Sequence, residues 1–260
     1  AKIIDGKAVA AQCRAELKIQ VEALKAEDIT PGLAVVLVGE DPASQVYVRG
    51  KEADCAQCGI RSFPYRLPAD TSQQALLDSL QLEIHQAALH SRRLILAPGN
   101  YGLDYLAQNY PELHEIPIVK VSNFIGEALD MAAAEHFAEV LLVGHVGKLV
   151  KLAGGIMNTH SKQADCRTEL FCTHAALCGA DTATCRALMD AATTDACLDI
   201  LTAADLKEPV MASLLQAIQL HLDRRAAEAF TVGAVLFSNQ SGPLGQTQQA
   251  EKLLQSWKGN

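Results

Sequence analysis

The chain alternates between short continuous apolar runs and longer stretches in which an apolar residue recurs every three or four positions. The short runs, such as 33–38 and 140–143, are rich in Val and Leu, which predicts buried strands. In 6–26, the recurring residues Val9, Cys13, Leu17, Val21 and Leu24 predict one apolar face of a helix. The expected helices are 6–26, 44–57, 72–89, 103–109, 125–136 and 248–257. The expected strands are 33–38, 60–67, 93–97, 118–121, 140–143 and 230–237.

This alternation of strands and helices predicts an α/β fold with a largely parallel sheet and helices on both faces. From 148 to 227 the pattern becomes mostly helical, so the C-terminal half should be helix-rich. Helix starts are indicated by Asp70-Thr71-Ser72, by Asp181 and by Thr194. Gly59 is typical of a helix end, and 242–245 (Gly-Pro-Leu-Gly) predicts a turn.

Charge and composition exclude some classes of function. The chain carries 30 acidic against 22 basic residues, a net charge of -8, whereas a nucleic-acid binder needs a concentrated basic face. The most apolar stretch, 140–157, is interrupted by His145, Lys148 and Lys151, so we expect no membrane span. Without an export pattern, the expected location is cytoplasmic.

The eight cysteines are expected to be reduced thiols rather than a disulfide framework. Cys55 and Cys58 form a C-x-x-C pair near a predicted helix end, where a structural role is favoured over a redox or metal role. His160 and His174 lack cysteines or carboxylates at ligand spacing. We therefore expect no metal site.

Three consecutive segments near the N-terminus carry one family resemblance. They are 1–7 (Ala-Lys-Ile-Ile-Asp-Gly-Lys), 31–39 (Pro-Gly-Leu-Ala-Val-Val-Leu-Val-Gly) and 41–48 (Asp-Pro-Ala-Ser-Gln-Val-Tyr-Val), followed by Lys51. In order and spacing they resemble the start of the bifunctional methylenetetrahydrofolate dehydrogenase/cyclohydrolase family. The resemblance implies that Tyr47 and Lys51 correspond to folate-site residues, and at i and i+4 on a helix they would share a face.

This first resemblance covers about 80 residues and then stops. The family's later motifs do not follow, and no strand is followed by G-x-G-x-x-G, so dehydrogenase chemistry is not expected. Two interpretations of Tyr47 and Lys51 stay open. They form either a folate-binding remnant or an inherited scaffold without active partners.

The rest of the chain resembles the cobalt-precorrin-5B C1-methyltransferase family of cobalamin biosynthesis. The matching segments are 96–102, 122–130, 141–161, 165–169, 232–239 and 244–247. The resemblance implies methylation at C1 of a cobalt-precorrin with S-adenosylmethionine as cofactor. It also implies that the family's additional N-terminal domain is replaced here by the folate-enzyme segment.

The expected organisation is therefore a chimera of two domains, 1–80 and 81–260, that changes parent within the helix predicted around 72–86. The strand 93–97 could complete a sheet begun by 33–38, which would make one continuous sheet. Oligomeric state is left open by the sequence.

Ligands of open α/β sheets bind at the carboxyl ends of strands, and the second resemblance places its motifs there. The expected cofactor-binding residues are Gly99, Asn100, Gly102, Asn123, Gly126, Glu127 and Gly144. His145 and Lys148 are the candidate catalytic residues, His145 as a base or hydrogen-bond donor. The candidate substrate-binding residues are Lys151, Asn158, His160 and Ser161.

Simpler interpretations exist for some of these residues. Glu127 could interact with a helix dipole instead of ribose hydroxyls, and the lysines could lie on a solvated helix face instead of binding corrinoid carboxylates. Three hypotheses follow for the whole chain: a corrinoid methyltransferase, a folate-binding fragment, or an inactive chimeric α/β scaffold. Methyl transfer from a sulfonium depends mainly on positioning, so no nucleophile is nominated.

Overall fold

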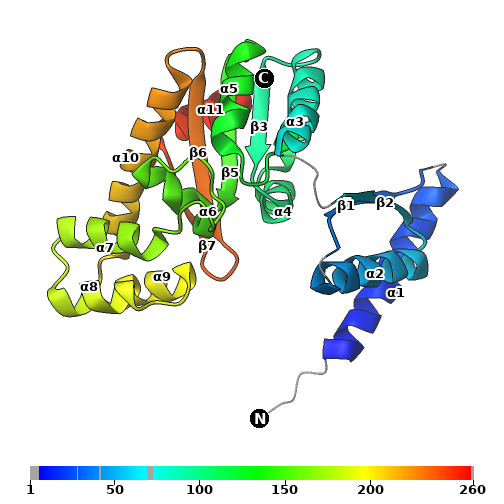
Figure 1. Ribbon diagram of the computed structural model, residues 1–260, viewed down its shortest axis with the longest axis horizontal. Coiled ribbons are helices and arrows are strands. Elements are labelled where there is room, and N and C mark those ends of the chain that lie inside the picture. The colour runs from blue at the N-terminus through cyan, green and yellow to red at the C-terminus, as the bar shows by residue number, and fades with distance from the viewer. Residues whose placement is uncertain (1–5, 28, 41, 69–72, 259–260) are drawn as a thin grey trace. The chain divides into compact units, whose positions relative to one another are not determined.

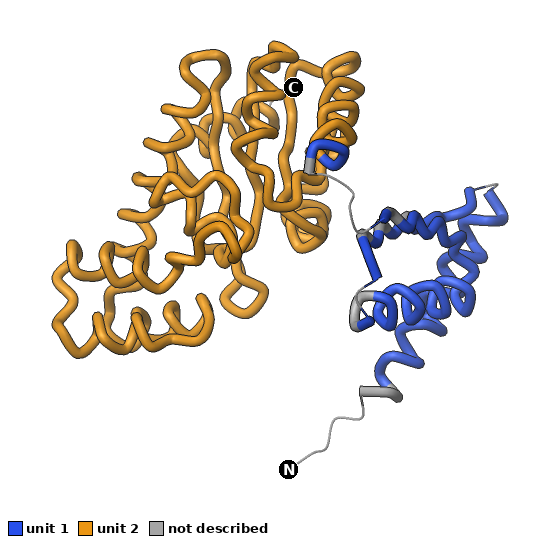
Figure 2. Tube along the Cα trace, viewed as in Figure 1, with its two compact units in different colours: residues 1–76 blue, residues 77–260 orange. Residues whose placement is uncertain are grey.

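The computed structural model describes residues 6–27, 29–40, 42–68 and 73–258. It divides into two compact units, 1–76 and 77–260 (Figure 2). The cap predicted at 70–72, residues 1–5 and Asp41 of the first resemblance lie outside the described residues. None of the helices in the described ranges is both long enough and apolar enough to cross a membrane.

The first unit contains α1 (Gly6–Ala26), β1 (Gly32–Val38), α2 (Pro42–Cys58) and β2 (Arg61–Leu67), and its two strands pair in parallel. Gly59 ends α2 as predicted, with a φ of 77° and a bond from the Ile60 N–H to the Cys55 carbonyl, which is typical of a Schellman ending. The predicted apolar face of α1 is only partly covered. Val21 is buried, but Val9 and Leu17 are exposed.

Five strands form the sheet of the second unit, in the spatial order β4-β3-β5-β6-β7. The parallel strands are β3 (Arg93–Ala97), β4 (Ile118–Lys120), β5 (Glu139–His145) and β6 (Thr231–Ser238). The turn predicted at 242–245 is instead part of β7 (Gly242–Gln246), which pairs antiparallel with β6. Pro243 is compatible with this strand because β7 lies at the sheet edge, where a proline costs no ladder bond.

Side-chain alternation along these strands builds two cores. Leu94, Leu96 and Leu142 belong to a core with α3 (Gln73–Ala88), α5 (Ile125–Ala134) and α10 (Lys207–Ala226). Their neighbours Ile95 and Leu141 belong to a second core with α4 (Asn100–Asn109) and α11 (Gln248–Lys258). The unit therefore has helices on both faces of a largely parallel sheet (Figure 1). The predicted fold class is confirmed.

The helix-rich C-terminal half is also confirmed. Between β5 and β6 the chain forms α6 (Val146–Leu149), a 3₁₀ segment (Val150–Gly154), α7 (Arg167–Leu177), α8 (Thr182–Met189), α9 (Thr194–Ala203) and α10. A further 3₁₀ turn, Pro111–Leu113, follows α4. Asp181 caps α8 as predicted. The cap of α9 is Thr193, whose hydroxyl accepts a bond from the Ala196 N–H, rather than the predicted Thr194.

The described strands fall into two sheets, one in each unit. Among the described residues β1 pairs with β2, whereas β3 pairs with β4 on one side and β5 on the other. Because both edges of β3 are occupied, β3 offers no edge on which β1 could add. The described strands thus form one sheet in each unit, and α3, which contains the boundary between the units, contributes Leu80 and Ile84 to the core of the second unit.

Candidate functional site

The carboxyl ends of β3, β4, β5 and β6 point to the same edge of the sheet, because the four strands are parallel. From β3 the chain crosses by α4 to β4, and then by α5 to β5 on the opposite side of β3. The crossover direction reverses between β3 and β5, and such a switch point is where open α/β sheets bind ligands. Most of the predicted site residues follow these strand ends.

The glycines at the switch point differ in what surrounds them. Gly99 has a φ of 115°, and a Cβ added there would meet no atom within 4 Å. A Cβ on Gly102 would lie 2.7 Å from the Val143 carbonyl oxygen, and one on Gly144 would lie 2.8 Å from Cγ of Pro98. Gly102 and Gly144 are buried. Gly102 permits close packing of α4 on β5, and Gly144 permits close packing of the end of β5 on the loop that follows β3. Protein atoms occupy the Cβ side of both glycines, so a cofactor could approach them only through their backbone groups, and the prediction that they bind one stays a prediction.

His145 ends β5 and caps α6, and its Nδ1 accepts a hydrogen bond of 3.0 Å from the Gly147 N–H. Since Nδ1 is an acceptor, the neutral ring carries its proton on Nε2. Burial lowers the pKa of His145, and the nearby carboxylate of Asp195 partly opposes this shift. The ring is therefore a hydrogen-bond donor at neutral pH, next to the rings of Tyr101 and Phe237 at 6.2 and 5.8 Å between centroids.

Asp195 and Ser238 form a polar pair at this edge that sequence reasoning missed. The Ser238 hydroxyl donates to the Asp195 carboxylate and accepts bonds from the Gln240 and Ser241 N–H groups. The two residues are 43 positions apart, so no local spacing connects them. Ser238 does lie in the 232–239 segment of the second resemblance, and this was the one feature of the sequence that could have indicated it as a site residue.

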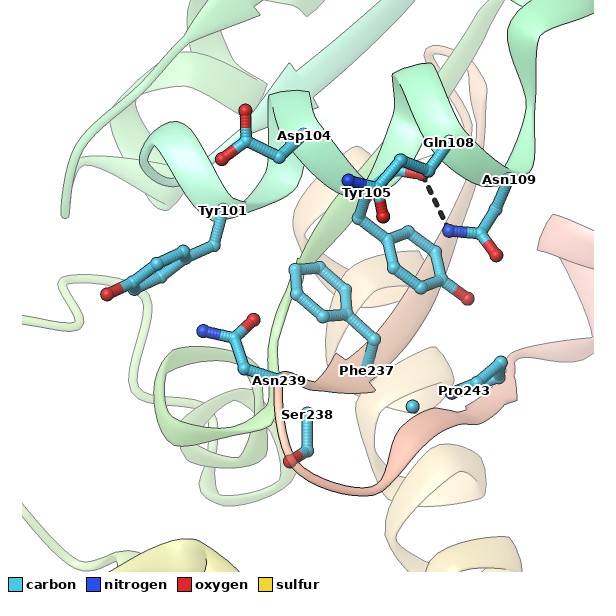
Figure 3. Close-up of a pocket in the computed structure, with 10 residues that line it drawn as sticks. Tyr101, Asp104, Tyr105, Gln108, Asn109, Phe237, Ser238, Asn239 and Pro243 are labelled. Atoms are coloured by element: carbon cyan, nitrogen blue, oxygen red, sulfur yellow. Dashed lines mark hydrogen bonds between the residues drawn. The ribbon is translucent and has the colours of Figure 1, made fainter. Parts of the chain in front are cut away.

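A pocket of about 440 Å³ opens between α4 and the β6–β7 hairpin (Figure 3). The residues on the α4 side are Tyr101, Asp104, Tyr105, Gln108 and Asn109, and the hairpin side includes Phe237, Ser238, Asn239 and Pro243. The Tyr105 and Phe237 rings stack with centroids 4.2 Å apart and planes 4° from parallel. Asn109 donates to the Tyr105 carbonyl over 2.9 Å, which fixes one end of the pocket. None of these residues was predicted individually.

Lysines join the loops around the pocket. The Lys120 ammonium donates to Oδ1 of Asn100 over 3.3 Å, which connects the end of β4 to the start of α4. The Lys148 ammonium donates to the Ser122 carbonyl over 3.0 Å, and burial together with the nearby Lys151 lowers the pKa of Lys148. Lys148 therefore connects the β5 and β4 loops, and it is not among the residues that line the pocket.

A second group of predicted residues holds the 157–160 segment against the β4–α5 loop. Asn123 accepts two hydrogen bonds from Thr159. The Thr159 N–H donates to the Asn123 carbonyl, and the Thr159 hydroxyl donates to Oδ1 of Asn123. Asn158 forms an isolated antiparallel bridge with Phe124. The Gly126 N–H donates to the Met157 carbonyl, and a Cβ on Gly126 would lie 2.8 Å from Cβ of Met157. Met157 therefore packs directly on Gly126, and a cofactor contact of this glycine stays a prediction.

Lys151 is 2% exposed, and its ammonium donates to the carbonyls of Thr159 and Ala164 at 3.1 and 2.8 Å. Asp165 lies 3.7 Å from the same nitrogen. With its donors directed at these groups, Lys151 holds the 159–165 segment. The direct substrate contact stays a prediction, and it would require these bonds to open.

The remaining predicted residues lie nearer to solvent. Glu127 is half-buried in the first turn of α5, where its carboxylate contributes to a raised pKa of Arg225, after the larger contribution of Asp130. His160 and Ser161 are exposed, and Nδ1 of His160 accepts a bond from the Lys162 N–H. Neither His160 nor Ser161 is among the residues that line the pocket.

In the first unit, Tyr47 and Lys51 do share a face of α2. The Lys51 ammonium lies over the Tyr47 ring, 4.7 Å from its centroid, as the i and i+4 spacing predicts. Within the described ranges, no group of three or more His, Cys, Asp or Glu side chains is placed to hold a metal ion.

Comparison with known proteins assigns the N-terminal and C-terminal parts of the chain to different families. The family described as CbiD, C-terminal domain, matches residues 158–248, and the family described as tetrahydrofolate dehydrogenase/cyclohydrolase, catalytic domain, matches residues 4–91. The chain joins parts that resemble two different families. Both resemblances expected from the sequence are thereby confirmed, and they are consistent with a chimera.

Individual relatives show the same division. The cobalt-precorrin-5B C(1)-methyltransferase of Ruminiclostridium cellulolyticum is 39% identical over 169 residues, 65% of this chain and 44% of that protein. The corresponding protein of Alkaliphilus metalliredigens is 32% identical over 188 residues, 72% of this chain and 49% of that protein. Bifunctional protein FolD of Moorella thermoacetica is 65% identical over 77 residues, 30% of this chain and 28% of that protein. The chain thus spans about half or less of the length of these relatives.

Proposed function

We propose that this chain transfers a methyl group from S-adenosylmethionine to C1 of a cobalt-precorrin. The observation that carries the proposal is the similarity of 169 to 188 residues to proteins named cobalt-precorrin-5B C(1)-methyltransferase. The strand-end edge of the second unit supports it, because the switch point, the open Gly99 and the adjacent pocket provide a place for a small ligand.

S-adenosylmethionine would supply an electrophilic methyl group. The bond between sulfur and the methyl carbon would break as an electron pair of the macrocycle at C1 forms the new bond, and the donor would leave as a neutral thioether. The chain's own contribution is then to orient and to exclude water, which can lower a barrier substantially without a nucleophile. In this proposal His145 donates a hydrogen bond from Nε2, and Lys148 positions the loops through Ser122.

All eight cysteines carry free thiols, which fits a reducing compartment, and a cytoplasmic location is part of the proposal. The test is to incubate the purified chain with S-adenosylmethionine and a cobalt-precorrin-5 substrate and to measure the product by mass spectrometry. The expected product carries one additional methyl group at C1. If calorimetry detects no S-adenosylmethionine binding at millimolar concentration, the proposal is wrong.

One observation favours a second candidate, a folate-binding fragment. The Lys51 ammonium over the Tyr47 ring retains the arrangement that the first resemblance implies for a folate site. A titration with 5-formyltetrahydrofolate should then give binding that Lys51→Met removes and that Lys18→Met, an exposed lysine of α1, leaves unchanged. If neither folate nor S-adenosylmethionine binds or raises the melting temperature, the chain is an inactive scaffold.

A further inference from the structure

The pocket between α4 and the β6–β7 hairpin has a distinctive lining. It presents an exposed aromatic ring, three side-chain amides and a single charged group, the carboxylate of Asp104. We propose that this pocket binds the adenosyl sulfonium of the methyl donor and excludes the corrinoid. The inference rests on the proposed function and deepens it, because it places the donor at residues that were not predicted individually as site residues.

Size is the first argument. A volume of about 440 Å³ lies within the range of roughly 300–1,000 Å³ that is common for small-molecule sites. A nucleoside with a short amino-acid arm fits this range. A corrinoid macrocycle with its peripheral carboxylates is much larger and requires an open surface.

Charge is the second argument. None of the residues that line the pocket is a lysine, arginine or histidine. Asp104 would attract the positive sulfonium of the donor and would repel the carboxylates of a corrinoid. His145, which lies beside the pocket rings, has a pKa that burial lowers, so it adds no positive charge at neutral pH.

Aromatic and amide groups give the third argument. Tyr101 is 61% exposed, and in Figure 3 its ring stands beside the pocket. The His145 ring, 6.2 Å away between centroids, is tilted by 47° to the Tyr101 ring rather than stacked on it. A purine can stack on such a ring, and an adjacent cation gains from the π face. The amides of Gln108, Asn109 and Asn239 offer donors and acceptors for a base edge or ribose hydroxyls. The stacked Tyr105 and Phe237 form a rigid apolar floor.

Calorimetry on the full chain tests this inference with S-adenosylmethionine, neutral S-adenosylhomocysteine and cobyrinic acid, a corrinoid polycarboxylate. The test variants are Tyr101→Ala and Asp104→Asn. Both residues are exposed, so these substitutions should leave the fold intact, as far-UV circular dichroism would verify. Tyr65→Ala in β2 and Asp190→Asn after α8 are matched controls, since both residues are exposed and lie outside the pocket.

We expect Tyr101→Ala to weaken both nucleosides by at least about fivefold, since both lose the ring on which the base stacks. Asp104→Asn should weaken S-adenosylmethionine at least about threefold and leave S-adenosylhomocysteine nearly unchanged, because only the former carries the sulfonium charge. If the wild type binds S-adenosylmethionine but neither variant changes the affinity, the pocket assignment is wrong and the proposed function survives. If Tyr101→Ala weakens cobyrinic acid and Asp104→Asn strengthens it, the pocket belongs to the corrinoid. If the wild type binds no S-adenosylmethionine, the proposed function fails and the assignment fails with it.

Discussion

Trp257 donates its indole N–H to Glu139, with 2.6 Å between Nε1 and Oε2. The same carboxylate oxygen accepts a bond of 3.0 Å from Nε of Arg93. Glu139 begins β5, Arg93 begins β3, and Trp257 lies in the last turn of α11. One carboxylate therefore attaches the C-terminal helix to the amino ends of two neighbouring strands, at the edge of the sheet opposite the candidate site.

Replacement of Glu139 by Ala should lower the free energy of unfolding of the second unit by about 1–3 kcal/mol, because an indole N–H and a guanidinium lose their charged acceptor. Glu139→Gln should cost less, since an amide oxygen still accepts one bond. Trp257 is the single tryptophan of the chain, so its fluorescence during denaturation reports on α11 directly. Equal stability of the wild type and Glu139→Ala would show that packing alone holds the helix.

Two helix glycines, one at the candidate site and one in the first unit, provide a second prediction with opposite signs. Gly102→Ala places a Cβ against the Val143 carbonyl, a backbone atom that cannot rotate away, and should destabilise the second unit by about 1–3 kcal/mol. Gly50, in α2, has no atom within 4 Å of an added Cβ. Gly50→Ala should stabilise the first unit by up to about 1 kcal/mol, because alanine favours helix.

Thermal unfolding followed by circular dichroism measures both substitutions. If Gly102→Ala unfolds at the wild-type temperature, α4 does not pack on β5 as closely as described. S-adenosylmethionine binding to Gly102→Ala would then separate a packing role for this glycine from the ligand contact first expected of it.

Local patterns were enough to predict most of the elements. Helix 6–26 and strand 93–97 match α1 and β3 at both ends, because hydrophobic periodicity and flanking turn residues are properties of short segments. The β7 strand was missed because Gly-Pro-Leu-Gly carries turn signals. It is extended because β6 offers an edge to pair with, which is a tertiary effect.

The site was predictable to the level of strand ends and no further. That Gly99, Gly144 and His145 lie at one edge follows from parallel topology. Whether a glycine faces open space or a neighbouring proline depends on how two loops pack, and Pro98 and Gly144 are far apart in sequence. The Asp195–Ser238 pair and the pocket likewise assemble from α4, α9 and β6, which no local pattern connects.

Lys151 gives a third prediction, which separates a structural lysine from a substrate-binding one. Lys151→Ala should lower the free energy of unfolding by about 2–4 kcal/mol, because the carbonyls of Thr159 and Ala164 lose a charged donor in a buried place. Amide hydrogen exchange in 157–165 should accelerate. Lys162→Ala, an exposed lysine in the same segment, is the control and should change stability by less than about 0.5 kcal/mol.

Protection in 157–165 that is unchanged in Lys151→Ala would contradict this role. A loss of corrinoid binding without a loss of stability would support the direct contact that the sequence suggested. Denaturation and exchange measured on the same sample distinguish these outcomes.

The last prediction concerns pH. Burial places the pKa of His145 below its ordinary value of 6.5, with Asp195 as a partial counterweight, and burial also lowers the pKa of His174. Between 6.5 and the lower folded-state value, the unfolded chain binds more protons than the folded chain. Stability should therefore fall as the pH drops below 6.5, and the loss should be complete once the pH passes the folded-state pKa values.

Imidazole NMR should show His145 protonated at Nε2 and unprotonated at Nδ1 at pH 7.5, because Nδ1 accepts the Gly147 N–H. Asp195→Asn should lower the pKa of His145 further, since it removes the carboxylate that favours the imidazolium. His145→Gln should reduce the loss of stability between pH 7.5 and 5.5. The loss that remains in this variant should come largely from the protonation of buried His174. A measured pKa of His145 above 6.5 would mean that the Asp195 charge outweighs burial, and the ring would then bring a positive charge to the edge of the pocket at neutral pH.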